Sequence, residues 1–377
     1  MVRPGISVLI EARRDLLTNR RIGVLTNASG VLPDLTSSFR ALMRYADVRA
    51  IFTPEHGLYG TVAPGEHVAS GFDRTGVPMY SLYGERLAPT LEQLAKLDAI
   101  VCDLQDVGCR FYTYAWTIIK TIEAAAQASV AVIVADRPNP VGGTIEGPGV
   151  EPELRTLVGL HDVPVRHGLT LGELARLVNH EADLGCDLTV VPCAGWQRSM
   201  LWAETGLPWA VPSLNIPAAE TALVYPGTCL LEGINVSVGR GTTKPFEWLG
   251  APWIDGVDLA EALNGLDLPG VRWRPVAFQP QTSVYDGSFC QGVQPHVIDA
   301  AALKPVALGL ALIAAIARLY PADLDWNAAH FDRLAGTGRI RQAISAGAPI
   351  ATITASWPAY EQAFRARTAP VLLYADR

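Results

Sequence analysis

The sequence has no long hydrophobic run, no cluster of basic residues and no CxxC pair. Its longest apolar stretch, residues 306–317, is about half the length needed to span a bilayer, so we interpret it as a buried helix and expect no membrane-spanning segment. Lys and Arg number 30 against 37 Asp and Glu, and this net charge of −7 argues against a nucleic-acid partner. The six cysteines are predicted to be buried free thiols rather than zinc ligands or disulfides.

Several signatures of cofactor and hydrolase sites are also missing. There is no G-x-G-x-x-G after the first predicted strand, no G-x-x-x-x-G-K-[ST], no H-E-x-x-H and no G-x-S-x-G. Residues 239–244 have the wrong glycine spacing for a phosphate loop. Residues 1–11 carry charges and no sustained apolar core, so we predict no signal peptide. A cytoplasmic location follows by default, or a secreted or periplasmic one if a leader was removed.

The length and the apolar content indicate a large folded protein with two domains. At 377 residues the chain exceeds the roughly 250–300 residues at which single cores stop growing. Strand and helix patterns alternate up to about residue 195, with strands predicted at 21–26, 48–52, 77–83, 99–101, 130–134 and 188–191. Helices are predicted at 37–45 and 113–127, and capping boxes at Thr90 and Thr170 open two more. This alternation predicts an α/β fold, a Rossmann-like, mostly parallel sheet with helices on both faces.

The composition of the sequence changes after Trp196, because residues 202–252 are rich in Gly, Pro, Trp and Thr and their periodicity is weak. Further on, strands are predicted at 271–278 and 294–298, and helices at 306–320, 330–335 and 355–365. We therefore predict a Rossmann-like domain over residues 1–200 that carries the catalytic residues. A smaller α+β domain over residues 201–377 is expected to close the cleft.

Polar residues follow three of the predicted strands directly. If those strands are parallel members of one sheet, their carboxyl ends meet at one edge, where open α/β sheets bind ligands. Glu55 and His56 follow the strand at 48–52, and a partly buried carboxyl group there suits a general acid. Glu66 is close enough in sequence to supply the second carboxylate that glycoside hydrolysis requires. A loop glutamate that caps a helix or pairs with an arginine is the alternative.

The other two strand ends combine acidic, basic and aromatic residues, which together suit a sugar ligand. Internal ion pairs, rigid turns and buried tyrosines are an equally good interpretation of the same residues. A loop from the second domain could close on this edge, and His167, beside a predicted helix start, is either a site residue or structural. The candidates are Asp103, Asp106, Arg110, Tyr112, Asp136, Arg137, Asn139, His167, Asn215, Glu232, Asn235, Arg240 and Thr242.

Six segments in one order resemble a known family. They are residues 54–57 (Pro-Glu-His-Gly), 103–108, 110–114, 136–140 (Asp-Arg-Pro-Asn-Pro), 225–228 and 232–242. Their residues and their order resemble those of the exo-acting β-N-acetylmuramidases, the NamZ-like glycoside hydrolase family 171, formerly a domain of unknown function. The resemblance covers nearly the whole chain. This chain departs from the pattern at Ile234, where we expect Thr, and at Val238, where an acidic residue is common.

The resemblance implies a Rossmann-like domain, an active site between two domains and no nucleotide or metal cofactor. It implies release of N-acetylmuramic acid from the non-reducing end of peptidoglycan fragments, with Glu55 as the catalytic acid. The partner carboxylate stays open among Glu66, Asp103, Asp106 and Glu146. The lactyl carboxylate of the substrate would be held by one of three arginines, Arg110, Arg137 or Arg240. A non-catalytic carbohydrate-binding or muropeptide-sensing protein is the alternative.

Overall fold

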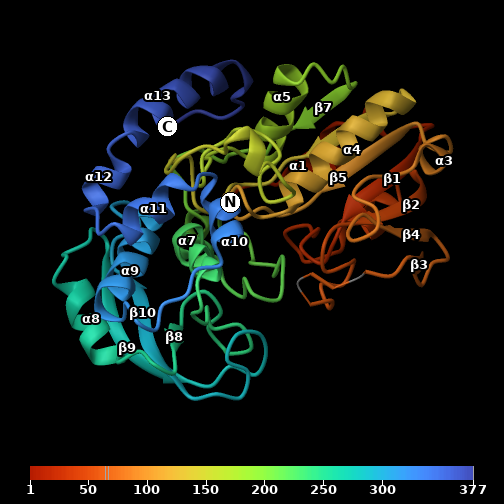
Figure 1. Cartoon of the computed structure of the whole chain (residues 1–377). Helices are drawn as coiled ribbons and strands as arrows, with labels where there is room; N and C mark the ends of the chain where they lie inside the picture. Colours follow the sequence, from red (N-terminus) through yellow and green to blue (C-terminus); the bar gives the residue numbers. More distant parts are fainter. Residues whose placement is uncertain (64, 67, 377) are drawn as a thin grey trace.

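The computed structural model describes residues 1–63, 65–66 and 68–376 and contains a seven-stranded sheet in the order β3-β4-β2-β1-β5-β6-β7 (Figure 1). Every neighbouring pair is parallel except β3 and β4. The strands are β1 (Arg21–Thr26), β2 (Asp47–Thr53), β3 (Gly71–Phe72), β4 (Pro78–Ser81), β5 (Ala99–Asp103), β6 (Ala131–Ala135) and β7 (Leu188–Val191).

Helices cover both faces of this sheet, because successive strand residues point to opposite sides and both sides are apolar. On one face α1 and α2 pack against Val24 and Val101, and on the other α3, α4 and α5 pack against Leu25 and Cys102. The helices are α1 (Gly5–Ala12), α2 (Ser38–Leu42), α3 (Leu91–Leu94), α4 (Tyr114–Ala128) and α5 (Leu171–Glu181). The capping boxes at Thr90 and Thr170 are present. The predicted fold class is confirmed.

Strand order decides which polar residues meet. β1 pairs with β2 on one side and with β5 on the other, so the strand ends that carry Glu55 and Asp103 are separated by β1. The chain runs from β1 outward to β2 and β4 and then returns to β5 across β1. Such a reversal opens a crevice at the carboxyl ends of the strands. Asn27, directly after β1, joins the candidates there.

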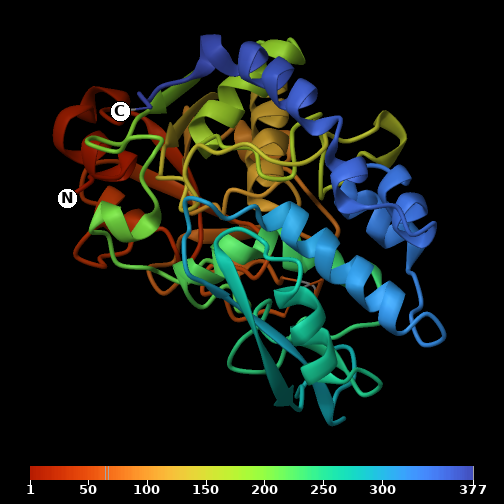
Figure 2. The same ribbon diagram turned by 90° about the vertical axis from the view of Figure 1, so that its left-hand side faces the viewer.

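A smaller C-terminal domain holds an antiparallel sheet in the order β8-β10-β9, which packs against α8, and α8 in turn contacts α9 (Figure 2). The strands are β8 (Leu249–Ala251), β9 (Val271–Phe278) and β10 (Cys290–Val297). The remaining helices of the chain are α6 (Trp202–Thr205), α7 (Ala219–Thr228), α8 (Gly256–Asn264), α9 (Pro305–Leu319), α10 (Ala328–Ala335), α11 (Arg339–Ser345), α12 (Ile350–Thr354) and α13 (Trp357–Thr368). The domain boundary near residue 200 stays a prediction.

Helix α9 contains the longest apolar stretch and is buried, as predicted. It crosses α7 so closely that a Cβ atom on Gly227 would lie 1.8 Å from the Pro305 carbonyl oxygen, which leaves room only for glycine. Within the described residues, no helix has the length and apolar character required to cross a membrane. All six cysteines are buried and free, which confirms that prediction.

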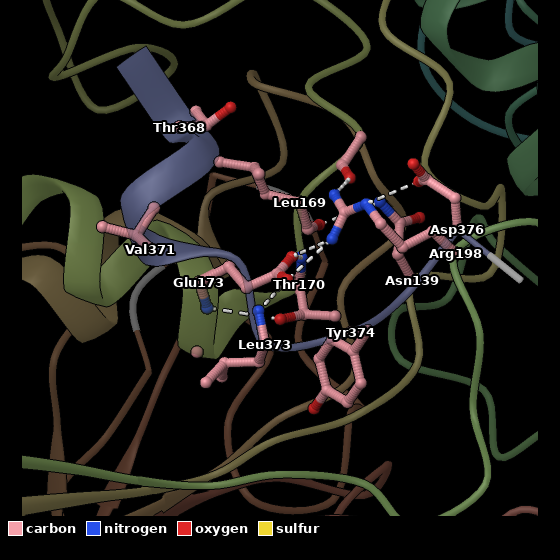
Figure 3. A network of polar contacts seen from close by, with 12 residues as sticks. Asn139, Leu169, Thr170, Glu173, Arg198, Thr368, Val371, Leu373, Tyr374 and Asp376 are labelled. Atoms are coloured by element: carbon pink, nitrogen blue, oxygen red, sulfur yellow. Dashed lines mark hydrogen bonds and ion pairs between the residues drawn. The ribbon is translucent and has the colours of Figure 1, made fainter. Parts of the chain in front are cut away.

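The C-terminal segment returns to the first sheet, where α13 lies beside α5 (Figure 1). Close by, Arg198 forms a buried ion pair with Glu173, at 2.6 Å between Nη1 and Oε1 (Figure 3). The Leu373 amide donates to the same Glu173 carboxylate at 2.9 Å. The last residues of the chain therefore cover part of the first domain and tie the two halves together.

Candidate active site

Two adjoining cavities lie beside the end of β2, between the first domain and loops of the second. The inner cavity has a volume of about 60 Å³ and the outer cavity about 980 Å³, and Asn215 and Arg240 line both. The inner cavity is lined by Glu55, His56, Phe111, Tyr112, Thr113, Tyr114, Ser213, Asn215, Ile216, Tyr225, Arg240 and Phe246. Of the other predicted residues, Glu66, Glu232 and Thr242 line the outer cavity.

Glu55 is held in the inner cavity by donors from two loops. Its Oε2 accepts a hydrogen bond from Thr113 Oγ1 at 2.8 Å, and its Oε1 accepts one from the Gly65 amide at 3.1 Å. Burial and the neighbouring Glu55 carboxyl raise the pKa of Tyr83, so its hydroxyl stays protonated. The Glu55 carboxyl group itself is half-buried and has a defined orientation, as a proton donor to a bound ligand requires.

The backbone around Glu55 has an unusual conformation. His56 has a φ of 72°, rare for a residue with a side chain, and Gly57 follows at 74°. The buried His56 ring lies 2.8 Å from the Val62 carbonyl oxygen through Nδ1. This contact holds the loop that carries Gly65 against Glu55. His56 therefore supports the loop and also lines the inner cavity.

Aromatic side chains from both domains form the wall of the inner cavity. Tyr112 and Tyr114 from the first domain have ring centroids 4.7 Å apart, as do Tyr225 and Phe246 from the second. Tyr112 meets Tyr225 edge-on at 6.1 Å, which joins the two pairs. The Tyr114 hydroxyl accepts a hydrogen bond from Asn27 Nδ2 at 2.8 Å. Such a wall offers apolar surface to one face of a sugar ring.

Arg240 is placed where the two cavities join. Its Nε donates to Glu232 Oε1 at 2.7 Å, and its guanidinium lies 4.9 Å from the ring centroid of Phe246. Gly239 and Gly241, with φ of 74° and 75°, flank it, and a Cβ atom on Gly241 would lie 2.6 Å from the Thr282 amide nitrogen. The tight packing of this loop against residue 282 therefore fixes the position of the guanidinium.

Asp103 and Arg137 form a buried ion pair outside both cavities. Arg137 donates from Nε to Asp103 Oδ1 at 2.6 Å and from Nη2 to Oδ2 at 2.9 Å. Asp103 is 0 % exposed and Arg137 is 5 % exposed. The bidentate geometry matches the internal pair that the sequence left as an alternative. The pair joins the ends of β5 and β6.

Arg110 and Glu146 also lie in the interior. The Arg110 guanidinium donates to three backbone carbonyls, and burial lowers its pKa to about 10, so it stays charged at neutral pH. Glu146 Oε1 accepts a hydrogen bond from the Ala307 amide in the first turn of α9 at 2.9 Å. Burial raises the pKa of Glu146. Both residues connect the loops of the first domain to the second.

Four further candidates make internal contacts. Asp106 accepts a hydrogen bond from the Gly108 amide at 2.7 Å and lies 3.3 Å from His167. Asn139 donates to the carbonyl of residue 169, and Asn235 bonds the backbone of residues 323 and 325. These residues shape loops around the cavities. The predicted residues that lie outside both cavities are Asp103, Asp106, Arg110, Asp136, Arg137, Asn139, Glu146, His167 and Asn235.

Asp136 accepts hydrogen bonds from the Thr170 hydroxyl, the Gly172 amide and the Tyr374 hydroxyl. Burial nevertheless raises its pKa from 3.8 to about 6. A carboxyl whose pKa is raised by folding stabilises the fold below its unfolded pKa, and this contribution is lost as the pH rises through the folded value. The free energy of unfolding of the wild type relative to Asp136→Asn is therefore expected to fall by up to about 3 kcal/mol between pH about 4 and about 6.

Urea denaturation of the wild type and of Asp136→Asn across this pH range measures the difference between their free energies of unfolding. The contributions of the other titrating groups cancel in this difference. A difference that stays constant with pH would contradict the assignment to Asp136.

Some cavity residues were not among the predicted site residues. Four of them lie in or shortly after the family-like motifs: Thr113, Tyr114, Tyr225 and Phe246. Their position relative to these motifs was the sequence signal that could have identified them. Asn27 follows β1, and strand order alone makes it a neighbour of the site. In the described part of the chain, no group of three or more His, Cys, Asp or Glu side chains is arranged to hold a metal ion.

Comparison with known proteins matches both halves of the chain. The family models "Exo-beta-N-acetylmuramidase NamZ, N-terminal" and "C-terminal" match residues 22–220 and 223–374. The peptidoglycan β-N-acetylmuramidase NamZ of Bacillus subtilis (strain 168) is 44 % identical over 378 residues, which cover 99 % of this chain and 91 % of that protein.

Two crystal structures of DUF1343 family proteins from Bacteroides fragilis are also similar. One has a TM-score of 0.92 and 36 % identity over 99 % of both chains, and the other has 0.79 and 29 % over 100 % of both. The two family models together span both domains, and the full-length relatives agree with them. The chain therefore belongs to the exo-β-N-acetylmuramidase NamZ family, as its motifs predicted.

Proposed function

We propose that this protein is a glycoside hydrolase that releases N-acetylmuramic acid from the non-reducing end of peptidoglycan-derived saccharides. The observation that carries the proposal is the Glu55 carboxyl, oriented by Thr113 and Gly65 in a cavity that both domains line. The activity named for the Bacillus subtilis relative, which is 44 % identical, supports the same reaction.

In the proposed reaction Glu55 gives its proton to the glycosidic oxygen while the bond from that oxygen to the anomeric carbon breaks. Water supplies the hydroxyl group that the anomeric carbon gains, and its proton passes to a second carboxylate. We assign that role to Glu66, because it follows Gly65, whose amide binds Glu55, and because it lines the outer cavity. The other three candidates, Asp103, Asp106 and Glu146, are buried and bonded elsewhere.

The dimensions of the cavities support removal of one terminal sugar. The inner cavity, at about 60 Å³, is small beside the outer cavity and leaves no room for a further sugar beyond the ring that reaches Glu55. A saccharide must therefore enter through the outer cavity of about 980 Å³ and stop at the aromatic wall. This arrangement favours an exo-acting enzyme.

Arg240 is proposed to bind the lactyl carboxylate, because Arg110 and Arg137 lie outside both cavities, whereas Arg240 lines both and contacts Glu232 through Nε. Arg240→Ala is expected to raise the KM for a β-N-acetylmuramide roughly 10- to 100-fold, since hydrogen bonds to charged groups contribute about 1.5–3 kcal/mol. Steady-state hydrolysis of a chromogenic muramide measures this, with the exposed Arg86→Ala as the control. An unchanged KM would contradict the role.

The proposed activity is tested by incubating the purified chain with 4-nitrophenyl β-N-acetylmuramide and with the matching β-N-acetylglucosaminide. We expect release of nitrophenol from the muramide only, because the glucosaminide lacks the lactyl carboxylate. Binding of N-acetylmuramic acid without hydrolysis of either glycoside would contradict the proposal.

A further inference from the structure

The outer cavity has a wall that the proposed chemistry does not use. One part is the tip of the hairpin between β9 and β10, where Thr282, Ser283 and Val284 face the cavity. Tyr285 anchors this tip: its hydroxyl donates to the carbonyl oxygen of residue 235 at 2.9 Å and accepts from Trp253 Nε1 at 2.9 Å. The wall is therefore held in place without a ligand.

His330, from α10, forms the other part of the wall beside Asn327. Its backbone amide is capped by the Asn327 side chain at 3.3 Å, while its half-buried imidazole makes no hydrogen bond to any other described residue. Burial lowers the pKa of His330. The nearby positive charges of Arg240 and Arg333 also lower it, while the Glu232 carboxylate acts in the opposite direction. The ring is therefore neutral at pH 7 and offers one donor and one acceptor.

The chemistry of the outer cavity suits a neutral sugar. Val236, Val238 and Val284 contribute apolar surface next to the polar groups of Asn215 and His330. On the side of the outer cavity away from Arg240, apolar patches and uncommitted donors and acceptors favour hydroxyl and acetamido groups.

We propose that this wall binds the neutral N-acetylated sugar on the reducing side of the scissile bond, and that His330 is a specificity-determining residue for this leaving group. The inference rests on the proposed function, which puts the terminal ring beside Glu55 and Arg240. The next ring must then lie in the outer cavity, the route by which the saccharide enters, and this wall borders that cavity. A nitrophenyl leaving group offers the imidazole neither hydroxyl nor acetamido groups.

The test compares two substrates, 4-nitrophenyl β-N-acetylmuramide and the disaccharide of N-acetylmuramic acid β-linked to N-acetylglucosamine. For His330→Ala we expect the ratio of kcat/KM for the disaccharide to kcat/KM for the aryl glycoside to fall about tenfold, through KM. His330→Gln, whose amide keeps a donor and an acceptor, is expected to retain most of the ratio. His180→Ala, on the exposed end of α5, is the matched control and leaves the ratio unchanged.

Thermal unfolding of each variant checks that the fold is intact. An unchanged ratio in His330→Ala, or an equal loss in His330→Ala and His330→Gln, would overturn this inference while leaving the proposed function in place. Absence of hydrolysis of both substrates by the wild type would overturn the proposed function and this inference with it.

Discussion

Glu55→Gln is expected to lower kcat for a β-N-acetylmuramide by roughly 10²- to 10⁴-fold, the usual contribution of a positioned general acid. Glutamine has nearly the same shape, and its amide oxygen still accepts a hydrogen bond from Thr113 or Gly65. It has no acidic proton to give to the glycosidic oxygen. The loss should therefore appear in kcat, with substrate binding and the thermal midpoint close to those of the wild type.

The matched control is Glu85→Gln, because Glu85 is exposed in the loop after β4. Steady-state kinetics on both variants separates loss of the acid from a general effect of removing a negative charge. Hydrolysis by Glu55→Gln at a near-normal rate would falsify the assignment of Glu55 as the acid.

The second large effect is expected on stability, from Asp103→Asn. This substitution leaves the Arg137 guanidinium buried without its countercharge, and breaking one side of a buried ion pair costs about 3–5 kcal/mol. Urea denaturation is expected to show that decrease in the free energy of unfolding. Activity measured well below the denaturation midpoint should be largely retained, since the pair lies outside both cavities.

Two comparisons sharpen this test. The double variant Asp103→Leu with Arg137→Met removes both charges and is expected to recover much of the lost stability, because no unpaired charge remains in the interior. Glu11→Gln breaks an exposed pair with Arg3 and is expected to change stability little. Equal destabilisation by the single and the double Asp103 variants would contradict the ion-pair explanation.

The strands were predictable because their signal is local. The predicted strands 21–26, 188–191 and 271–278 coincide with β1, β7 and β9. β1 and β7 are short runs rich in apolar and β-branched residues, and β9 begins with alternating buried and exposed positions. The capping boxes before α3 and α5 depend on residues three apart and were equally visible.

Several helices were missed where the local signal conflicts with the final structure. Helix α7 contains Pro226 within a segment crowded with Gly and Thr, and it was interpreted as irregular. Its stability comes from packing against α9, where Gly227 allows a close approach. Helices α1 and α8 are short and amphipathic, and tertiary packing supports such helices more than propensity does.

The roles of the polar residues depended on contacts far apart in sequence. Asp103 and Arg137 are 34 residues apart, and Glu146 meets the amide of Ala307 161 residues away. The sequence left Asp103 and Arg137 with two interpretations, because acids and arginines in a motif suit a ligand site and an ion pair equally well. Only the fold distinguishes the groups that bond internally from those, such as Glu55 and Arg240, that face a cavity.

The sequence by itself determined the α/β class, the buried free cysteines and, through six ordered motifs, the family. These features follow from local periodicity, composition and short motifs, which a linear chain displays directly. The tertiary structure decided that β1 separates the strand ends of Glu55 and Asp103 and that Arg240 faces the cavities. It also brought His330 to the outer cavity. Strand order and domain packing bring distant segments together, and that proximity has no local signature in the sequence.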